Sequence, residues 1–141
     1  MMTLNTYLTF NNECREAFEF YRSVFGGEFM TISTFREAPE DLGVAEEDLD
    51  RIMHVSLPIG SNVLMGSDTC SSFGPPRVPG NNFSLCFETG ERSHADEVFA
   101  KLSNGGKVMM PMGDVFWGSY YGKCTDKFGI TWDIMACPTQ E

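Results

Sequence analysis

The 141-residue chain lacks the features of membrane proteins and of small disulfide-bonded secreted proteins. No apolar run approaches the roughly 18 residues of a membrane span, and the Met1-Met2-Thr3 start is not the basic, then apolar, opening of a signal peptide. The five cysteines form no Cys-x-x-Cys pair, so neither a disulfide framework nor a structural zinc site is expected. We therefore expect a soluble, cytoplasmic protein with free thiols.

Positive charge is also scarce. Ten Lys and Arg oppose 20 Asp and Glu, which gives a net charge of −10. A surface this acidic repels phosphate backbones and anionic lipids, and no basic patch interrupts it. We expect no binding to nucleic acid or to membranes. The charge serves solubility or, alternatively, attracts a cationic ligand.

The chain reads as two copies of one small unit. Residues 5–10 and 82–87 align when Asn5 is placed on Asn82 and Phe10 on Phe87. Each segment alternates like a half-buried strand, and a helical pattern ending in Gly-Gly follows each. We expect one domain over 1–141, with module one at about 1–68, a linker at about 69–80 and module two at about 81–138.

Each module is predicted to have the order β-α-β-β-β. Apolar residues at three- and four-residue spacing predict helices over 13–25 and 94–103, with Asn12 and Ser93 as N-caps. Alternating segments predict the strands 5–10, 28–35, 51–59, 62–67, 82–87, 107–112, 119–125 and 130–137. The acidic segment 36–50 is expected to be a solvated loop or short helix. The predicted fold class is α+β, with duplicated modules forming curled mixed sheets and the helices outside.

Alternation along the strands sorts the side chains onto two faces of each predicted sheet. One face is apolar and should pack against the helices; Val63 and Met65 are assigned to it. The other face mixes amides, hydroxyls, a thiol and charged groups, which suits a ligand cleft. A dimer interface or a hydrated sheet face would give the same pattern. The residues expected to line the cleft are Asn5, Tyr7, His54, Asn82, Cys86 and Asp133.

The segment 116–122, Phe-Trp-Gly-Ser-Tyr-Tyr-Gly, interleaves aromatic residues with glycine. Such residues line a flexible cleft mouth and stack on planar ligands, so Trp117 and Tyr121 are ligand-binding candidates. Packing of Trp117 under the sheet or in a dimer contact is the alternative. Lys123, assigned as the counterpart of His54 in the second module, would offset Asp133 or hold an anionic ligand.

Three stretches, 7–28, 52–68 and 116–132, carry a resemblance to a known family. With the duplicated unit, they resemble the vicinal oxygen chelate superfamily, which has the glyoxalase/bleomycin resistance fold. Within it they resemble the PhnB/YjdN family, often labelled 3-demethylubiquinone-9 3-methyltransferase-like. The resemblance implies a homodimer with a cleft inside each curled sheet. It does not carry methyl transfer with it, since no Gly-x-Gly turn follows a first strand to cradle the cofactor.

The superfamily usually holds a divalent metal, and the resemblance implies that its four ligand positions are Asn5, Leu64, Asn82 and Asp133. Only Asp133 is a good ligand, because amide oxygens bind transition metals weakly and leucine has no donor atom. His54 is predicted to point into the same cleft. No cofactor is firmly expected, and a weakly bound divalent metal at His54 and Asp133 stays open.

Two functions stay open. The first is a glyoxalase/bleomycin-resistance-like protein of the PhnB type that binds a small ligand in the sheet cleft without chemistry; the missing metal ligands and the negative charge favour it. The alternative is a metal-assisted enzyme, of the lyase, isomerase or transferase class, acting on a substrate with vicinal oxygens. In that enzyme, His54 or Asp133 would be the catalytic residue that moves the proton.

Overall fold

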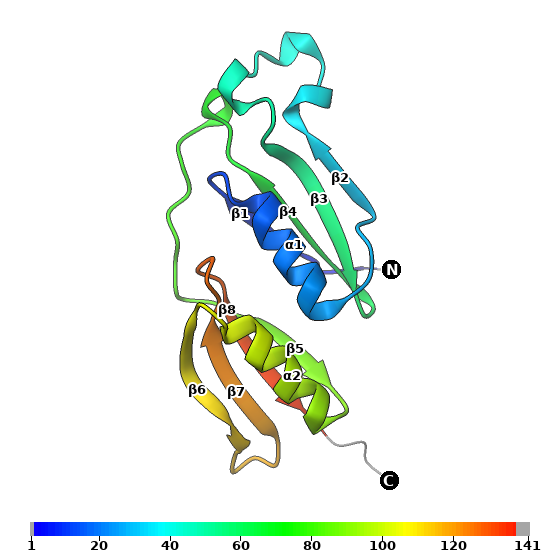
Figure 1. Ribbon diagram of the computed structural model, residues 1–141, viewed down its shortest axis with the longest axis vertical. Helices are drawn as coiled ribbons and strands as arrows, with labels where there is room; N and C mark the ends of the chain where they lie inside the picture. Colours follow the sequence, from blue (N-terminus) through cyan, green and yellow to red (C-terminus); the bar gives the residue numbers. More distant parts are fainter. Residues whose placement is uncertain (1, 138–141) are drawn as a thin grey trace. The chain divides into compact units, whose positions relative to one another are not determined.

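The computed structural model describes residues 2–137 and contains two compact units, divided between Val78 and Pro79 (Figure 1). The division falls inside the segment 69–80 that the sequence predicts as a linker. Each unit has the predicted order of one strand, one helix and three further strands. None of the helices within residues 2–137 has the length and apolar character needed to cross a membrane.

The first unit is a four-stranded mixed sheet with one helix. Its elements are β1 (Thr6–Phe10), α1 (Cys14–Phe25), β2 (Thr31–Thr34), β3 (Ile52–Ile59) and β4 (Asn62–Asp68). The strand order is β1-β4-β3-β2, with β1 parallel to β4 and the other pairs antiparallel. Three short 3-10 turns, η1 (Phe35–Glu37), η2 (Glu40–Leu42) and η3 (Glu46–Asp48), occupy the acidic segment, and η4 (Ser71–Phe73) follows β4.

The second unit repeats this arrangement. Its elements are β5 (Leu85–Thr89), α2 (Arg92–Ser103), β6 (Lys107–Asp114), β7 (Tyr120–Thr125) and β8 (Thr131–Ala136). The order is β5-β8-β7-β6, with β5 parallel to β8. In each unit, a helix and two further strands separate the two parallel strands in sequence, and the remaining strand pairs are antiparallel, so the fold is α+β, as predicted.

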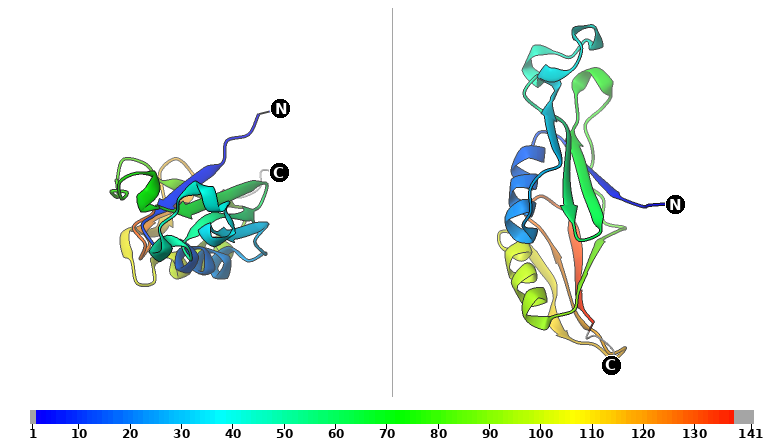
Figure 2. Two further views of the ribbon diagram at one scale, coloured as in Figure 1. Left: turned by 90° about the horizontal axis from the view of Figure 1, so that it is seen from above. Right: turned by 90° about the vertical axis from the view of Figure 1, so that its right-hand side faces the viewer.

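Each helix covers one face of its own sheet, as the side view shows (Figure 2). In α1, the stripe Ala17, Phe18 and Tyr21 is fully buried, and in α2 Val98 and Leu102 are fully buried. Burial of such side chains stabilises a fold by about 1.5–3 kcal/mol for each large apolar group. Among residues 2–137, no helix of the same unit lies on the opposite face of either sheet; we call that face the open face.

The predicted N-caps are wrong. The N-cap positions are Glu13 for α1 and Glu91 for α2, and neither makes a side-chain cap hydrogen bond. The first turn of α1 is instead held by a distant residue: the amide of Cys14 donates to Oδ1 of the buried Asp68 over 2.9 Å. The predicted helix end is confirmed, because Gly26 closes α1 with φ +83°, a conformation that favours glycine.

The assignment of faces on β4 is also corrected. A Cβ atom on Gly66 would lie 2.6 Å from the Cε1 atom of the buried Phe18, so Gly66 faces α1. Leu64, two residues away, shares that face and is buried, which leaves Val63 and Met65 on the open face. The sequence placed Val63 and Met65 against the helix because both sets of alternating side chains on β4 are apolar.

Candidate functional site

The open face of the first unit brings together two of the predicted site residues. The hydroxyl of Tyr7 on β1 lies 3.4 Å from Nδ1 of His54 on β3, and the two ring centroids are 5.8 Å apart. Asn5 is engaged elsewhere: its Oδ1 accepts a hydrogen bond of 3.3 Å from the amide of Val63. Tyr7 and His54 therefore form a polar aromatic pair, whereas the side chain of Asn5, just before the edge strand β1, is hydrogen-bonded to the backbone of β4.

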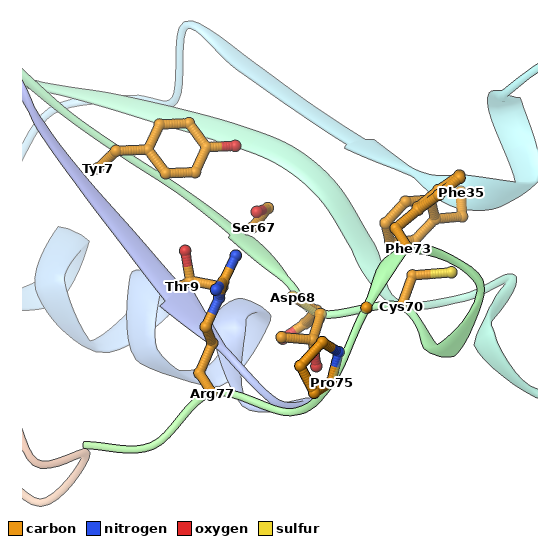
Figure 3. Close-up of a pocket in the computed structure, with 11 residues that line it drawn as sticks. Tyr7, Thr9, Phe35, Ser67, Asp68, Cys70, Phe73, Pro75 and Arg77 are labelled. Carbon is orange, nitrogen blue, oxygen red and sulfur yellow. The ribbon is translucent and has the colours of Figure 1, made fainter.

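A pocket of about 370 Å³ opens at one end of this face (Figure 3). Its polar lining includes the side chains of Tyr7, Thr9, Ser67 and Arg77, which come from β1, β4 and the segment before the division of the units. Its apolar wall includes the rings of Phe35 and Phe73, whose centroids are 6.3 Å apart.

The open face of the second unit centres on Asp133 of β8. Its carboxylate accepts hydrogen bonds from the hydroxyl of Tyr121 on β7 and from that of Ser84, which precedes β5. The ammonium of Lys123 lies 3.7 Å from Oδ1 of Asp133. The side chain of Asp133 is only 15% exposed, so this charge is stabilised mainly by these three neighbours.

The cluster sets the ionisation of the groups around it. Burial and the hydrogen bond to Asp133 raise the pKa of Tyr121 to about 12, so its hydroxyl stays a donor at neutral pH. Burial and the nearby negative charge of Asp133 also raise the pKa of the Cys86 thiol. A protonated thiol is a poor nucleophile, so Cys86 is suited to contacting a ligand and not to attacking one.

Aromatic side chains stand next to this cluster. The ring centroid of Trp117 lies 5.9 Å from that of Tyr121, and the ring of Phe116 packs edge-on against Trp117 at 4.9 Å. Trp117 is 56% exposed, so within its own unit it does not pack under the sheet. A planar surface of this kind, beside fixed polar groups, can stack on a flat molecule.

A second pocket, of about 570 Å³, lies on the same unit. Lys107 and Lys123 line it together with the predicted site residue Asn82 and the hydroxyl-bearing residues Ser84, Thr125 and Thr131. The lining is therefore locally basic although the whole chain is acidic.

The strand registers correct the predicted correspondence between the modules. The amide of Thr69 donates to the carbonyl of Phe10, and the amide of Cys137 donates in the same way to Thr89. Phe10 thus corresponds to Thr89, two residues beyond the predicted Phe87. On this count, the following pairs occupy equivalent positions: Asn5 and Ser84, Tyr7 and Cys86, Met65 and Asp133, His54 and Tyr121, and Ser56 and Lys123.

The positions that the superfamily resemblance implies for a metal do not form a metal site within either unit. Leu64 faces α1, and both oxygens of Asp133 already accept hydrogen bonds. The nearby ammonium of Lys123 would repel a cation. No group of three His, Cys, Asp or Glu side chains able to hold a metal occurs among residues 2–137. Within either unit, the donor set present therefore does not fit a divalent ion. His54 and Asp133 lie in different units, and a metal held by both stays a prediction.

Sequence reasoning missed several of these residues, among them Ser84 and Arg77. Ser84 alternates in step with Asn82 and Cys86, so the same face assignment that selected those two residues would have found it. Arg77 is a single basic residue in a segment rich in Pro and Gly, in a chain with only ten Lys and Arg. That scarcity was a usable signal.

Known proteins resemble the chain over nearly its whole length. YjdN of Escherichia coli (strain K12) is 28% identical over 147 residues, covering 99% of this chain and 98% of YjdN. The crystal structure of PA1353 from Pseudomonas aeruginosa is 32% identical with a TM-score of 0.88, covering 99% of this chain and 100% of PA1353. A putative 3-demethylubiquinone-9 3-methyltransferase, PhnB protein, from Bacillus cereus is 25% identical with a TM-score of 0.77, covering 96% and 100%.

More distant structures define the fold class. A glyoxalase-related enzyme from Fulvimarina pelagi superposes with a TM-score of 0.64 at 14% identity, covering 96% of this chain and 88% of that protein. The fold is therefore the glyoxalase/bleomycin resistance fold. Within it, the profile of the 3-demethylubiquinone-9 3-methyltransferase family matches residues 2–135, and the chain belongs to this PhnB-like family.

Proposed function

We propose that this chain binds a small planar molecule on the open face of its second sheet, with Trp117 and Tyr121 packing on the flat part of the molecule. The observation that carries the proposal is the Asp133 cluster. Two hydroxyls and an ammonium are held around one poorly exposed carboxylate, on a face that the helix does not cover and directly beside an exposed tryptophan. A core would not need these polar groups, and they resemble the few fixed polar groups of ligand sites.

The partners of Asp133 leave donors available for the ligand. Lys123 makes one contact to the carboxylate at 3.7 Å, and an ammonium carries three N–H donors. Asn82 adds an amide to the lining of the neighbouring pocket. Because two lysines line that pocket, a planar ligand with hydrogen-bond acceptors suits the site better than the cationic ligand that the net charge of the chain suggests.

Methyl transfer is not part of the proposal, although the family label names it. The turn between β1 and α1 is Asn11-Asn12-Glu13 and contains no glycine. A cofactor-cradling loop needs glycines so that the backbone can approach the ligand. The proposal therefore takes from the label only membership of the family.

The test is a thermal-shift screen with planar aromatic compounds in three matched sets: neutral, anionic and cationic. A true ligand should raise the Tm of the wild type but not that of Trp117→Ala, and it should raise that of Asp133→Asn less than the wild type's. Met30→Ala and Asp114→Asn are the controls, because both residues are exposed and lie outside the cluster. An equal rise in all variants, or no rise with any compound, would refute the proposal.

A further inference from the structure

The 370 Å³ pocket of the first unit is lined by Arg77, which forms no ion pair with the described residues. Within residues 2–137, no acceptor lies within hydrogen-bond or ion-pair distance of the Arg77 guanidinium. Four of the five other arginines are ion-paired: Arg22 with Glu19, Arg36 with Asp50, Arg51 with Asp48 and Arg92 with Asp114. The fifth, Arg15, lines a different pocket together with the carboxylates of Glu16, Glu19 and Asp50. In a chain with twice as many acidic as basic residues, a cation that faces a pocket unpaired is a feature to explain.

The backbone at Arg77 is fixed by a side chain from the β1–α1 turn. Oδ1 of Asn11 accepts a hydrogen bond of 2.8 Å from the amide of Arg77, and its Nδ2 donates to the carbonyl of Arg77 over 3.1 Å. Thr69 also donates to Oδ1 of Asn11. This two-way pairing holds one residue of a Pro- and Gly-rich segment in place, so the direction of the arginine side chain is set by the fold.

The guanidinium extends toward hydroxyl groups on the sheet. Figure 3 shows Arg77 beside Thr9, with Ser67 and Tyr7 on the same side of the pocket. The carboxylate of Asp68 does not close this site, because both its oxygens accept backbone amides, from Cys14 and Ile52. The pocket thus combines a planar cation with hydroxyl donors, which suits a carboxylate or phosphate group.

We propose that this pocket binds the carboxylate or phosphate group of a small molecule whose apolar part packs on Phe35 and Phe73. The oxyanion is held by Arg77 and by the hydroxyls of Thr9 and Ser67. The rings of Phe35 and Phe73, whose centroids are 6.3 Å apart, form the apolar wall of the pocket. The site lies entirely in the first unit, so it does not depend on the function proposed for the second.

The test is an NMR titration of the full ¹⁵N-labelled chain with benzoate, phenyl phosphate and, as the neutral counterpart, phenol, at constant ionic strength. Saturable shifts are expected at the amides of Thr9, Ser67 and Arg77 with at least one anion, and not with phenol. Comparing benzoate with phenyl phosphate identifies which oxyanion the pocket prefers. Arg77→Gln should weaken binding by about tenfold or more, since hydrogen bonds to charged groups are among the strong ones.

Two further variants separate charge from fold. Arg77→Lys keeps the charge but loses the fork of donors, so it should bind between the wild type and Arg77→Gln. Arg36→Gln removes an exposed arginine outside the pocket and should bind as the wild type does. The proposal is overturned by wild-type affinity in Arg77→Gln, by equal shifts with phenol, by shifts confined to the second unit, or by the absence of binding with both anions.

Discussion

Replacing Gly66 by alanine tests how α1 sits on the first sheet. The new Cβ atom would lie 2.6 Å from Cε1 of Phe18 and 2.9 Å from the carbonyl oxygen of Leu8. Neither neighbour can move away freely. Phe18 is fully buried and packs edge-on against Phe10 and Tyr21, and the Leu8 carbonyl belongs to the strand paired with Gly66.

The expected cost follows from overpacking. Adding a methyl group to a filled core typically destabilises a protein by about 1–3 kcal/mol. The lower chain entropy of alanine in the unfolded state returns roughly 0.5–1 kcal/mol. Since two contacts fall below 3 Å and one involves backbone, we expect a net loss of about 1–3 kcal/mol. In a unit of this size, each kcal/mol lowers Tm by roughly 4–8 °C.

The assay is chemical and thermal unfolding of the two variants Gly66→Ala and Gly113→Ala beside the wild type. Gly113 is also a strand glycine, on β6, but a Cβ there would meet no atom within 4 Å. Gly113→Ala should therefore be neutral or slightly stabilising. Equal stability of the two variants would show that Gly66 does not face α1, and the assignment of the open face of β4 would fall with it.

Three other perturbations have definite signs. In a spectrophotometric titration, Tyr121 should ionise near pH 12, and Tyr121→Phe should remove that step. Because the pKa of Tyr121 is raised in the folded state, the stability from its hydrogen bond to Asp133 is complete below pH 10 and is lost as the pH rises through about 12. Ionisation of Tyr121 near pH 10 would contradict this. The pKa of Asp48 is lowered, chiefly by hydrogen bonds from Ser71, so its contribution to the stability of the fold is present at neutral pH and is lost as the pH falls through the folded-state pKa. In unfolding experiments, Asp48→Asn should be less stable than the wild type at pH 7, and the difference should disappear in acid. Asp48→Asn should also be more destabilised than the exposed control Asp50→Asn. Adding Mn²⁺ or Zn²⁺ to chelator-treated protein should leave Tm unchanged, and a saturable rise at one ion per chain would refute the conclusion that the donor set does not fit.

Much of the fold follows from local pattern. The stripe of α1, the Gly26 turn and the duplicated order of elements depend on residues close in sequence, so periodicity predicts them. The start of β5 does not: it was predicted at Asn82 and lies at Leu85. The sequence predicts a solvated loop or short helix over 36–50, and short 3-10 turns form there. Asp48 within this segment is nevertheless buried and ion-paired with Arg51 at 3.2 Å. The abundance of acidic residues in this segment does not show that Arg51, three residues after Asp48, forms an ion pair with it.

Part of the candidate site could be predicted from the sequence. Alternation selects Asp133, the aromatic and glycine segment 116–122 selects Tyr121, and the correspondence with His54 selects Lys123. The structure brings the three residues together although that correspondence is wrong. His54 contacts Tyr7 in the first unit, and its role in catalysis or binding stays a prediction, as do the homodimer and a cleft shared by both modules. Alternation places Ser84 on the same face as Asn82 and Cys86, but its hydrogen bond to Asp133 joins residues 49 positions apart, which no local pattern shows.

The sequence by itself determined two repeated units, each with one amphipathic helix. It also identified the polar residues on those strands in which one face is apolar and the other polar. The tertiary structure alone decided which side of β4 meets Phe18, which residues of the two modules correspond, and that Arg77 points into a pocket. The reason is that periodicity records only the environment of each residue along its own element. The pairing of strands, the packing of a helix on a sheet and the pinning of a loop by Asn11 join residues far apart in the chain, and no local pattern specifies them.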